Sequence, residues 1–250
     1  MSERDEDKKR IENYFNKAKE IISEIKRIRS KRKIGAIVIS DAIILSVPFG
    51  LDSPENYSNL RQLCIAIQKI QFGLSLEGIW LRGAISFGNA YINNDESQIV
   101  GPAYVNAYLL EQISATHPRV ILDSKLIGKL GFSSAQELIT KINNTHDAQE
   151  YRPETSNILY EWYHNGTLKH GLEKDIPLFI DYMVYCFVQE GALTRIVSSV
   201  EASMYANSDI YLKYRWVVDY LISSCIHHNN HILLIDSTAL HEQLGKLKNL

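Results

Sequence analysis

The stretch IVISDAIILSVP, residues 37–48, sets one aspartate between two runs of aliphatic and β-branched residues. Such runs favour β-strands, whereas serine and aspartate tolerate tight turns. The stretch and its flanks therefore predict a β-hairpin over residues 33–48, with Ser40 and Asp41 at the turn. An aspartate at a turn is commonly a solvated turn residue, so any function of Asp41 depends on what its neighbours bring to it.

The segments around this hairpin predict an α+β fold. An amphipathic helix over residues 7–30 precedes the hairpin, with Ile11 and Phe15 on its apolar side. After the hairpin, the pattern predicts a helix, a strand that bends into a second strand, a helix and a last strand, over residues 60–71, 78–92, 101–116 and 119–123. The order α-(ββ)-α-β-α-β is typical of an α+β sheet with helices packed on one face.

Two regions of the chain differ in composition. Residues 1–125 hold the hairpin, helices and strands just described, and they form the core of the predicted domain. Residues 126–250 are mainly helical and rich in aromatic residues. Within them YLKYRWVVDYLISS (211–224) predicts a core helix rather than a nucleic-acid stacking surface, and HILLID (231–236) predicts a late strand. We expect this region to complete the domain and to add dimer contacts.

Charge and cysteine content restrict the classes of function. The net formal charge of −2 gives no overall field that attracts nucleic acid. Residues 1–33 carry a local charge of +5, which indicates a solvated helix face, or else a contact with phosphate or another subunit. The three cysteines lie far apart without a CxxC motif, as is typical of buried thiols in a reducing compartment. No run approaches the roughly 20 apolar residues of a membrane span, and no signal peptide opens the chain, so we expect a soluble, cytoplasmic protein.

Three separated features supply the parts of a metal-dependent phosphoryl-transfer site. Asp41 offers a carboxylate to a divalent metal, and Arg82, in the glycine-containing strand LRGAISFG (81–88), offers a positive charge to phosphate oxygens. The helix that begins at Gly101 would present free N–H groups and the positive end of its dipole to phosphate. In such sites, positioning and charge neutralisation supply most of the catalysis.

The segments SDAIILS (40–46), LRGAISFG (81–88), GPAYVNAYLLE (101–111) and HPRVILD (117–123) occur in the order and spacing of a known family. Over residues 8–125 the chain resembles the class III nucleotidyl cyclases, and more narrowly the bacterial pyrimidine cyclases of the Pycsar anti-phage system. The resemblance implies a ferredoxin-like βαββαβ core and a head-to-tail homodimer with two composite active sites. It also implies Mn²⁺ or Mg²⁺, and cyclisation of UTP, or in second place CTP, to the 3′,5′-cyclic monophosphate and pyrophosphate. The product would signal to a separate cyclic-nucleotide-gated effector.

The resemblance assigns roles to individual residues. Asp41 matches the metal-binding aspartate of the family's hairpin, and Arg82 matches an arginine that is either structural or part of the dimer interface. Gly101 and Tyr104 would contact the nucleotide at the start of the helix that faces the partner's site. Asn106 on the same helix would act in catalysis, or else be an outward, solvated residue.

Two features depart from the family pattern. Val105 and Leu109 occupy the places of the family's asparagine and arginine on that helix. The family's opening strand, which carries its first metal-binding aspartate, has no counterpart here, because Asp5 and Asp7 lack flanking apolar residues. Either the true start lies upstream, or the chain is a non-catalytic nucleotide- or partner-binding relative, or Asp236 of the late strand supplies the missing ligand.

A histidine group near the C-terminus is another candidate for metal binding. His228 and His231 have the spacing of neighbours on one helix face, and His227 adjoins them. However, no cysteine or carboxylate cluster lies near them in the sequence, and Asn229-Asn230 predicts a turn. The pattern therefore does not favour a zinc site.

Overall fold

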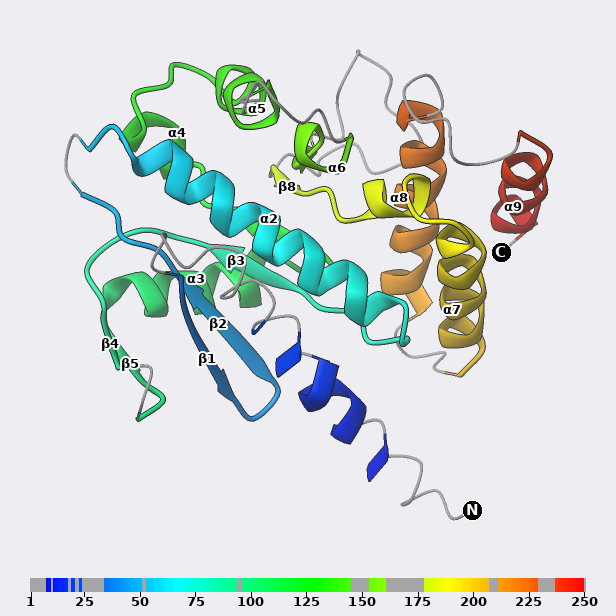
Figure 1. The fold of residues 1–250 in the computed structure, drawn as a ribbon, viewed down its shortest axis with the longest axis horizontal. Coiled ribbons are helices and arrows are strands. Elements are labelled where there is room, and N and C mark those ends of the chain that lie inside the picture. Colours follow the sequence, from blue (N-terminus) through cyan, green and yellow to red (C-terminus); the bar gives the residue numbers. More distant parts are fainter. Residues whose placement is uncertain are drawn as a thin grey trace.

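The computed structural model describes residues 8–9, 11–17, 19–20, 23, 34–50, 53–93, 96–144, 153–160, 178–206, 211–228 and 237–249. Its strands are β1 (Gly35–Ile39), β2 (Ala42–Ser46), β3 (Gly83–Ile85), β4 (Tyr91–Asn93), β5 (Gln98–Val100), β6 (Val120–Leu122), β7 (Leu159–Tyr160) and β8 (Phe179–Ile180). Its helices are α2 (Asn56–Ser75), α3 (Pro102–Ser114), α4 (Lys125–Lys129), α5 (Ala135–Asn144), α6 (Pro153–Ser156), the 3₁₀-helix η1 (Met183–Phe187), α7 (Ala192–Ala206), α8 (Tyr211–His228) and α9 (Ser237–Asn249). The described residues between 8 and 23 are helical as well. Helices occur together with small, mostly antiparallel sheets, and the described elements at the C-terminal end are all helical (Figure 1), so the predicted α+β class is confirmed.

The β1–β2 hairpin forms where the sequence predicts it. Its strands pair antiparallel, with Ile39 opposite Ala42 at the last position before the turn. Ser40 has a φ of 53°, the left-handed conformation that two-residue hairpin turns favour. Apolar side chains of both strands pack against α2 in one cluster, which includes Ile70. The turn at Ser40 and Asp41 is therefore confirmed, and packing against α2 holds the hairpin in place.

Strand β6 is the centre of the main sheet. It pairs in parallel with β3 and antiparallel with β8, in a four-stranded sheet of order β3-β6-β8-β7. All three of its residues are buried. Val120 and Leu122 belong to a core cluster with the first half of α2, whereas Ile121 belongs to the cluster that contains α7 and α8. A strand whose alternate side chains enter two different cores needs cover on both faces.

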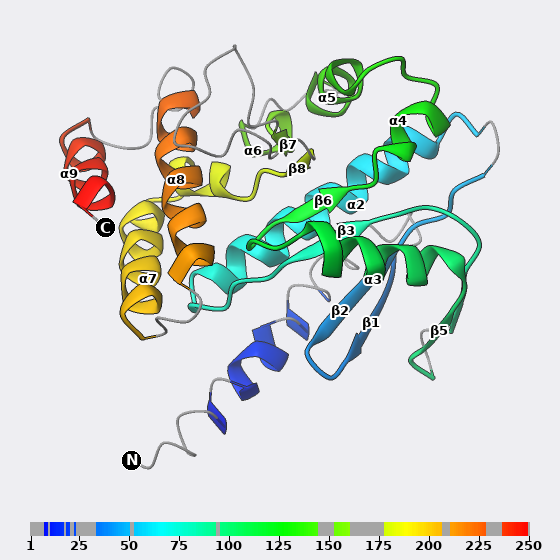
Figure 2. The ribbon, with the colours of Figure 1, turned by 180° about the vertical axis from the view of Figure 1, so that it is seen from behind.

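Helices accordingly cover both faces of this sheet. Helix α2 lies in front of it in Figure 1, and α3 lies in front of it in Figure 2, where the molecule is turned by 180°. The prediction of helices on one face is therefore wrong. The physical reason is the run of three apolar residues in β6, which would expose hydrophobic surface if either face were open.

The hairpin is separate from the four-stranded sheet. Among the described residues, β1 and β2 pair only with each other, and β4 and β5 form a further two-stranded sheet. A βαββαβ core implies one continuous sheet, whereas the described strands form three separate sheets. The structure therefore does not support the class III arrangement, which stays a prediction. Strands β5, β7 and β8 were not predicted; β7 and β8 bring the C-terminal half of the chain into the main sheet. The predicted strand at residues 231–236 lies outside the described residues.

The C-terminal helices pack around an aromatic core. Tyr214, Trp216 and Tyr220 of α8 are buried, which confirms the predicted core helix. The ring of Phe179 in β8 lies 5.6 Å from that of Trp216 and 5.1 Å from that of Tyr220, edge to face in both cases. This geometry matches the electrostatic preference of aromatic pairs, so α8 is held to the sheet by specific ring contacts as well as by burial.

The three cysteines agree with the expectation from the sequence. Cys64, Cys186 and Cys225 are buried free thiols, as predicted. Burial raises the pKa of the Cys225 thiol to about 12, so it stays protonated and unreactive at neutral pH. None of the helices in the described part is both long enough and apolar enough to cross a bilayer.

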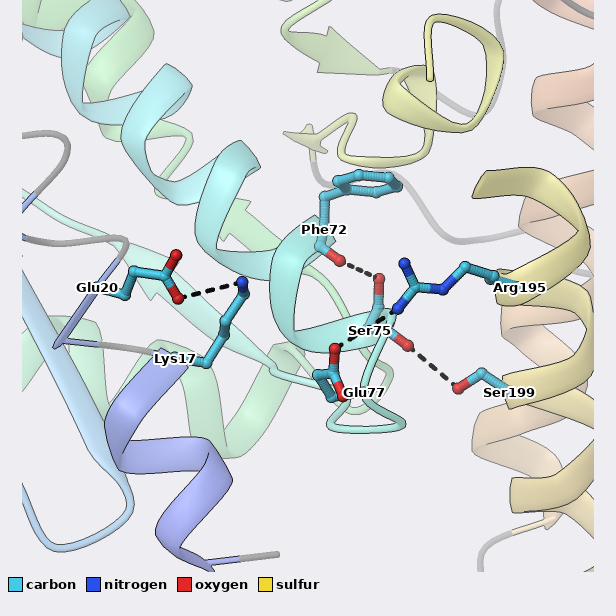
Figure 3. A network of polar contacts seen from close by, with 7 residues as sticks. All are labelled: Lys17, Glu20, Phe72, Ser75, Glu77, Arg195 and Ser199. Atoms are coloured by element: carbon cyan, nitrogen blue, oxygen red, sulfur yellow. Dashed lines mark hydrogen bonds and ion pairs between the residues drawn. The ribbon is translucent and has the colours of Figure 1, made fainter. Parts of the chain in front are cut away.

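Polar contacts join the end of α2 to α7 (Figure 3). The Ser75 hydroxyl donates to the Phe72 carbonyl oxygen at 2.7 Å, and the Ser199 hydroxyl donates to the Ser75 carbonyl oxygen at 3.1 Å. Beside them, Arg195 forms an ion pair with Glu77 at 3.5 Å. Because Ser75 and Ser199 are 124 residues apart in the sequence, these contacts fix the C-terminal helices against the N-terminal half.

A buried carboxylate joins α8, α2 and the sheet. Asp181, directly after β8, is 1% exposed, and the Tyr220 hydroxyl donates to its Oδ1 at 2.5 Å. Gln68 Nε2 of α2 donates to the Asp181 carbonyl oxygen at 2.7 Å. Burial, and next the charge of Asp181, raise the pKa of Tyr220 well above its ordinary value, so its hydroxyl remains a donor at any physiological pH.

We expect Tyr220→Phe to lower the free energy of unfolding by about 2 kcal/mol, because a buried carboxylate loses a hydrogen-bond donor. Urea denaturation followed by circular dichroism measures the change. Tyr205→Phe is the matched control, since Tyr205 on α7 is 80% exposed, and its midpoint should equal that of the unchanged chain. Equal midpoints for both variants would contradict a stabilising role for the Tyr220–Asp181 contact.

Candidate functional site

Asp41 lies at the exposed tip of the β1–β2 hairpin. The Tyr14 hydroxyl donates to its backbone carbonyl oxygen at 2.8 Å, and among the described residues no group donates to its carboxylate. Tyr14 is buried, and burial, with the charge of Asp41 as the smaller cause, raises the pKa of Tyr14 to about 12. Tyr14 therefore stays protonated, anchors the turn through the backbone and leaves the Asp41 carboxylate open to solvent.

The described residues supply a sparse metal-ligand set around Asp41. They contain no group of three or more histidine, cysteine, aspartate or glutamate side chains that could hold a metal ion. Asp236 and His231, which the sequence raised as possible ligands, lie outside the described residues, as do Asp5 and Asp7. Mg²⁺ is commonly held by one or two carboxylates together with substrate phosphates and water. Asp41 is thus a single exposed carboxylate that could serve as one protein ligand of such an ion.

Arg82 directly precedes β3 and binds a side chain of α3. Its Nε lies 2.6 Å from Oε1 of Glu111, and both side chains are partly exposed. The neighbouring Leu81 packs in the same cluster as Ile43 of β2. The structure therefore gives Arg82 a structural partner that positions α3.

Gly101 packs against the chain that follows β3. Its φ is +139°, and a Cβ there would lie 2.5 Å from the Asn89 carbonyl oxygen, so a side chain cannot be accommodated without a backbone shift. The same carbonyl oxygen accepts a hydrogen bond from the Ala103 N–H at 3.2 Å, and Pro102 has no N–H. The first turn of α3 thus offers fewer free donors to a phosphate than the sequence suggests, and the nucleotide contacts of Gly101 and Tyr104 stay predictions.

Helix α3 exposes an uncharged apolar face. None of its residues is buried, and Val105, Tyr108, Leu109 and Ile113 are between 47% and 74% exposed. We name these four residues the α3 face. The one charged residue of α3, Glu111, is turned inward to Arg82. Tyr91 and Val100 of the adjacent β4–β5 hairpin are also exposed and extend the apolar surface.

A single chain does not bring the predicted site residues together. Asp41 lies at the turn of the hairpin, and Arg82 pairs with Glu111 of α3. Gly101 lies against Asn89, beyond the other end of β3, and Figures 1 and 2 both show the start of α3 well away from the hairpin tip. Asn106 is exposed on α3, as the solvated alternative predicted. Within one chain, therefore, the start of α3 does not reach the hairpin tip.

Sequence reasoning missed the partners of these residues. Tyr14 is buried while Ile11, on the predicted apolar side of the first helix, is 57% exposed, so the buried stripe is rotated from the predicted one. The ion pair of Glu111 could have been predicted from the sequence. Glu111 is the single acid in an otherwise uncharged helix, and such an acid needs a cationic partner when it faces inward. No sequence signal pointed to Asn89, because its contact uses only a backbone oxygen.

Comparisons with known proteins give no relative for this chain. No family model matches it, no curated protein matches it, and no solved structure matches it. The site must therefore be judged on its own geometry and on the residue pattern.

We expect Gly101→Ala to lower the free energy of unfolding by about 2 kcal/mol or more, because the new Cβ meets backbone atoms at an unfavourable φ. Chemical denaturation measures this change. The control is Gly128→Ala on α4, where a Cβ has no atom within 4 Å, and it should be neutral or stabilising by up to about 1 kcal/mol. If the two substitutions had the same effect, the packing of Gly101 on Asn89 would not hold α3 in place.

Proposed function

We propose that this chain is a homodimeric, metal-dependent pyrimidine nucleotide cyclase that converts UTP to 3′,5′-cyclic UMP and pyrophosphate. The observation that carries the proposal is Asp41, whose carboxylate lies open to solvent at the tip of the predicted hairpin. This is the position of the metal-binding aspartate in the class III cyclases that the chain resembles. The base preference rests on that resemblance, with CTP as the second substrate to test.

The reaction needs little nucleophilic machinery from the protein. The substrate's own 3′-oxygen loses its proton and bonds to the α-phosphorus, while the bond from the α-phosphorus to the bridging oxygen breaks and pyrophosphate leaves. The protein's task is to hold the ribose and triphosphate in line and to offset negative charge. Bound Mn²⁺ or Mg²⁺ supplies that neutralisation. Asp41 would help to hold the ion, and Tyr14 keeps the Asp41 backbone fixed while it does so.

The α3 face supports the homodimer. Large exposed apolar residues without charge are typical of the centre of a protein interface, where charged residues are depleted. Two copies of an uncharged face can approach each other without like-charge repulsion. In a head-to-tail pair, Tyr104 and Asn106 of one protomer would meet Asp41 of its partner, which joins residues that lie apart within one chain.

A non-catalytic nucleotide-binding relative is the second candidate. The single carboxylate at the hairpin favours it, because divalent cations normally take several oxygen ligands. The two candidates differ in whether they convert a nucleoside triphosphate to product, and both are expected to form the dimer. For the cyclase, we expect the cyclic product to be the signal passed to a separate effector.

Asp41→Ala should abolish formation of cyclic UMP. The protein is incubated with each of the four ribonucleoside triphosphates and Mn²⁺ or Mg²⁺, and products are identified by mass spectrometry. Glu96→Ala is the matched control, since Glu96 is an exposed acid in the β4–β5 turn and should leave turnover unchanged. A cyclic product that persists in Asp41→Ala would exclude Asp41 as a metal ligand, and no product from any triphosphate would favour the non-catalytic candidate.

Leu109→Glu should convert the dimer to a monomer, because it places an unpaired charge in the apolar α3 face that the dimer would bury. Sedimentation velocity measures the change in mass over a dilution series. Leu212→Glu is the control, since Leu212 on α8 is 74% exposed and lies outside the α3 face. The interface assignment fails if the chain is monomeric without substitution, or if Leu109→Glu sediments as the same dimer.

A further inference from the structure

An open hollow lies beyond the carboxyl ends of β3 and β6, away from the hairpin tip. It has a volume of about 570 Å³ and is lined by Phe87, Ser124, Lys125, Gly128 and Lys129. Phe87 follows β3, and the other four residues follow β6 at the start of the chain's next helix. Neighbouring parallel strands end at the same edge of a sheet, and crevices at such edges are common ligand sites. The hollow is open to solvent over most of its boundary, so a ligand bound there would stay partly exposed.

Helix α4 turns a polar face toward this hollow. Leu126 is buried in the core, so Ser124, Lys125, Gly128 and Lys129 lie on the exposed side. Gly128 has no side chain, and a Cβ added there would have no atom within 4 Å. The glycine therefore keeps the space between the two lysines open.

Neither lysine of this face forms an ion pair with the described residues. The nearest acid in the sequence, Asp123, is engaged in the turn, where its Oδ1 accepts the Lys125 backbone N–H at 3.0 Å. Lys129 Nζ instead lies 5.8 Å from the centre of the Phe87 ring, a cation–π contact. Two ammonium groups and a hydroxyl thus border one hollow without a paired carboxylate, which suits a phosphate group.

The aromatic wall adds a second type of contact. The rings of Phe87 and Phe49 lie 6.1 Å apart and are tilted by 38°. Phe49 is partly exposed, so this ring pair borders solvent next to the lysines. Lys129 sits over Phe87 on a flexible four-carbon stem; its movement toward a bound anion would free the ring face for a planar base.

We infer that this hollow is a nucleotide-binding site, in which Lys125, Lys129 and Ser124 hold a phosphate and Phe87 stacks on the base. The site is distinct from the proposed catalytic centre. Strand β2 runs from the Asp41 turn toward Phe49, and its five residues span about 17 Å at about 3.4 Å each. Figures 1 and 2 both show α4 far from the hairpin tip. The ligand here would be bound without being turned over.

Isothermal titration with uridine 5′-monophosphate, inorganic phosphate and uridine tests the inference on the full chain. We expect the monophosphate to bind more tightly than either fragment, and less tightly at high salt, because exposed lysines are screened. Lys125→Gln and Lys129→Gln should each weaken its binding about tenfold. Gly128→Leu, which places a bulky side chain between the two lysines without changing charge, should weaken it further. Lys248→Gln on α9 is the control and should bind as the unchanged chain does.

The same variants separate this site from the cyclase proposal. Asp41→Ala should retain binding of uridine monophosphate at the hollow, and Lys125→Gln should retain any cyclase turnover. The inference is overturned if the monophosphate does not bind, if the two lysine variants and Gly128→Leu bind it undiminished, or if inorganic phosphate binds equally tightly.

Discussion

Parallel pairing of β6 with β3 puts three consecutive apolar residues between two layers of helices, and the rest of the fold depends on this arrangement. Val120 and Leu122 enter the core that α2 and α5 close, and Ile121 enters the core that α7 and α8 close. Antiparallel pairing of β6 with β8 brings the C-terminal half of the chain into the same sheet. Next to β8, the buried hydrogen bond from Tyr220 to Asp181 holds α8 against this sheet. Burial on both faces makes the two halves of the chain one unit.

The way α3 is attached to β3 determines what the molecule can do at its surface. The helix is fixed near its start by the Gly101–Asn89 contact and further along by the Arg82–Glu111 ion pair. These attachments use its only charge and its close-packing glycine on the inner side, so the outer side is left apolar. They also keep the start of α3 away from Asp41, and this separation is what gives a second chain a role in the proposed cyclase.

The two proposed ligand positions lie at opposite ends of the β2 strand and differ in chemistry. At the hairpin tip a lone carboxylate faces solvent, which suits a cation and a metal-bound phosphate. At the other end, two lysines that form no ion pair with the described residues and an aromatic pair border a hollow, which suits a phosphate and base bound without a metal. If both proposals hold, this division would separate a position for turnover from a position for recognition of nucleotide.

The sequence by itself determined the hairpin, its turn at Asp41, the α+β class, the core helix at residues 211–224 and the buried cysteines. Each of these follows from local turn preference, or from the period of apolar residues, which short segments carry on their own. It did not determine the cover on both sheet faces, the strands β7 and β8, the partners Tyr14 and Glu111, or the separation of Gly101 from Asp41. Those features were decided by the tertiary structure, because each depends on contacts between residues distant in sequence, whose geometry no local pattern contains.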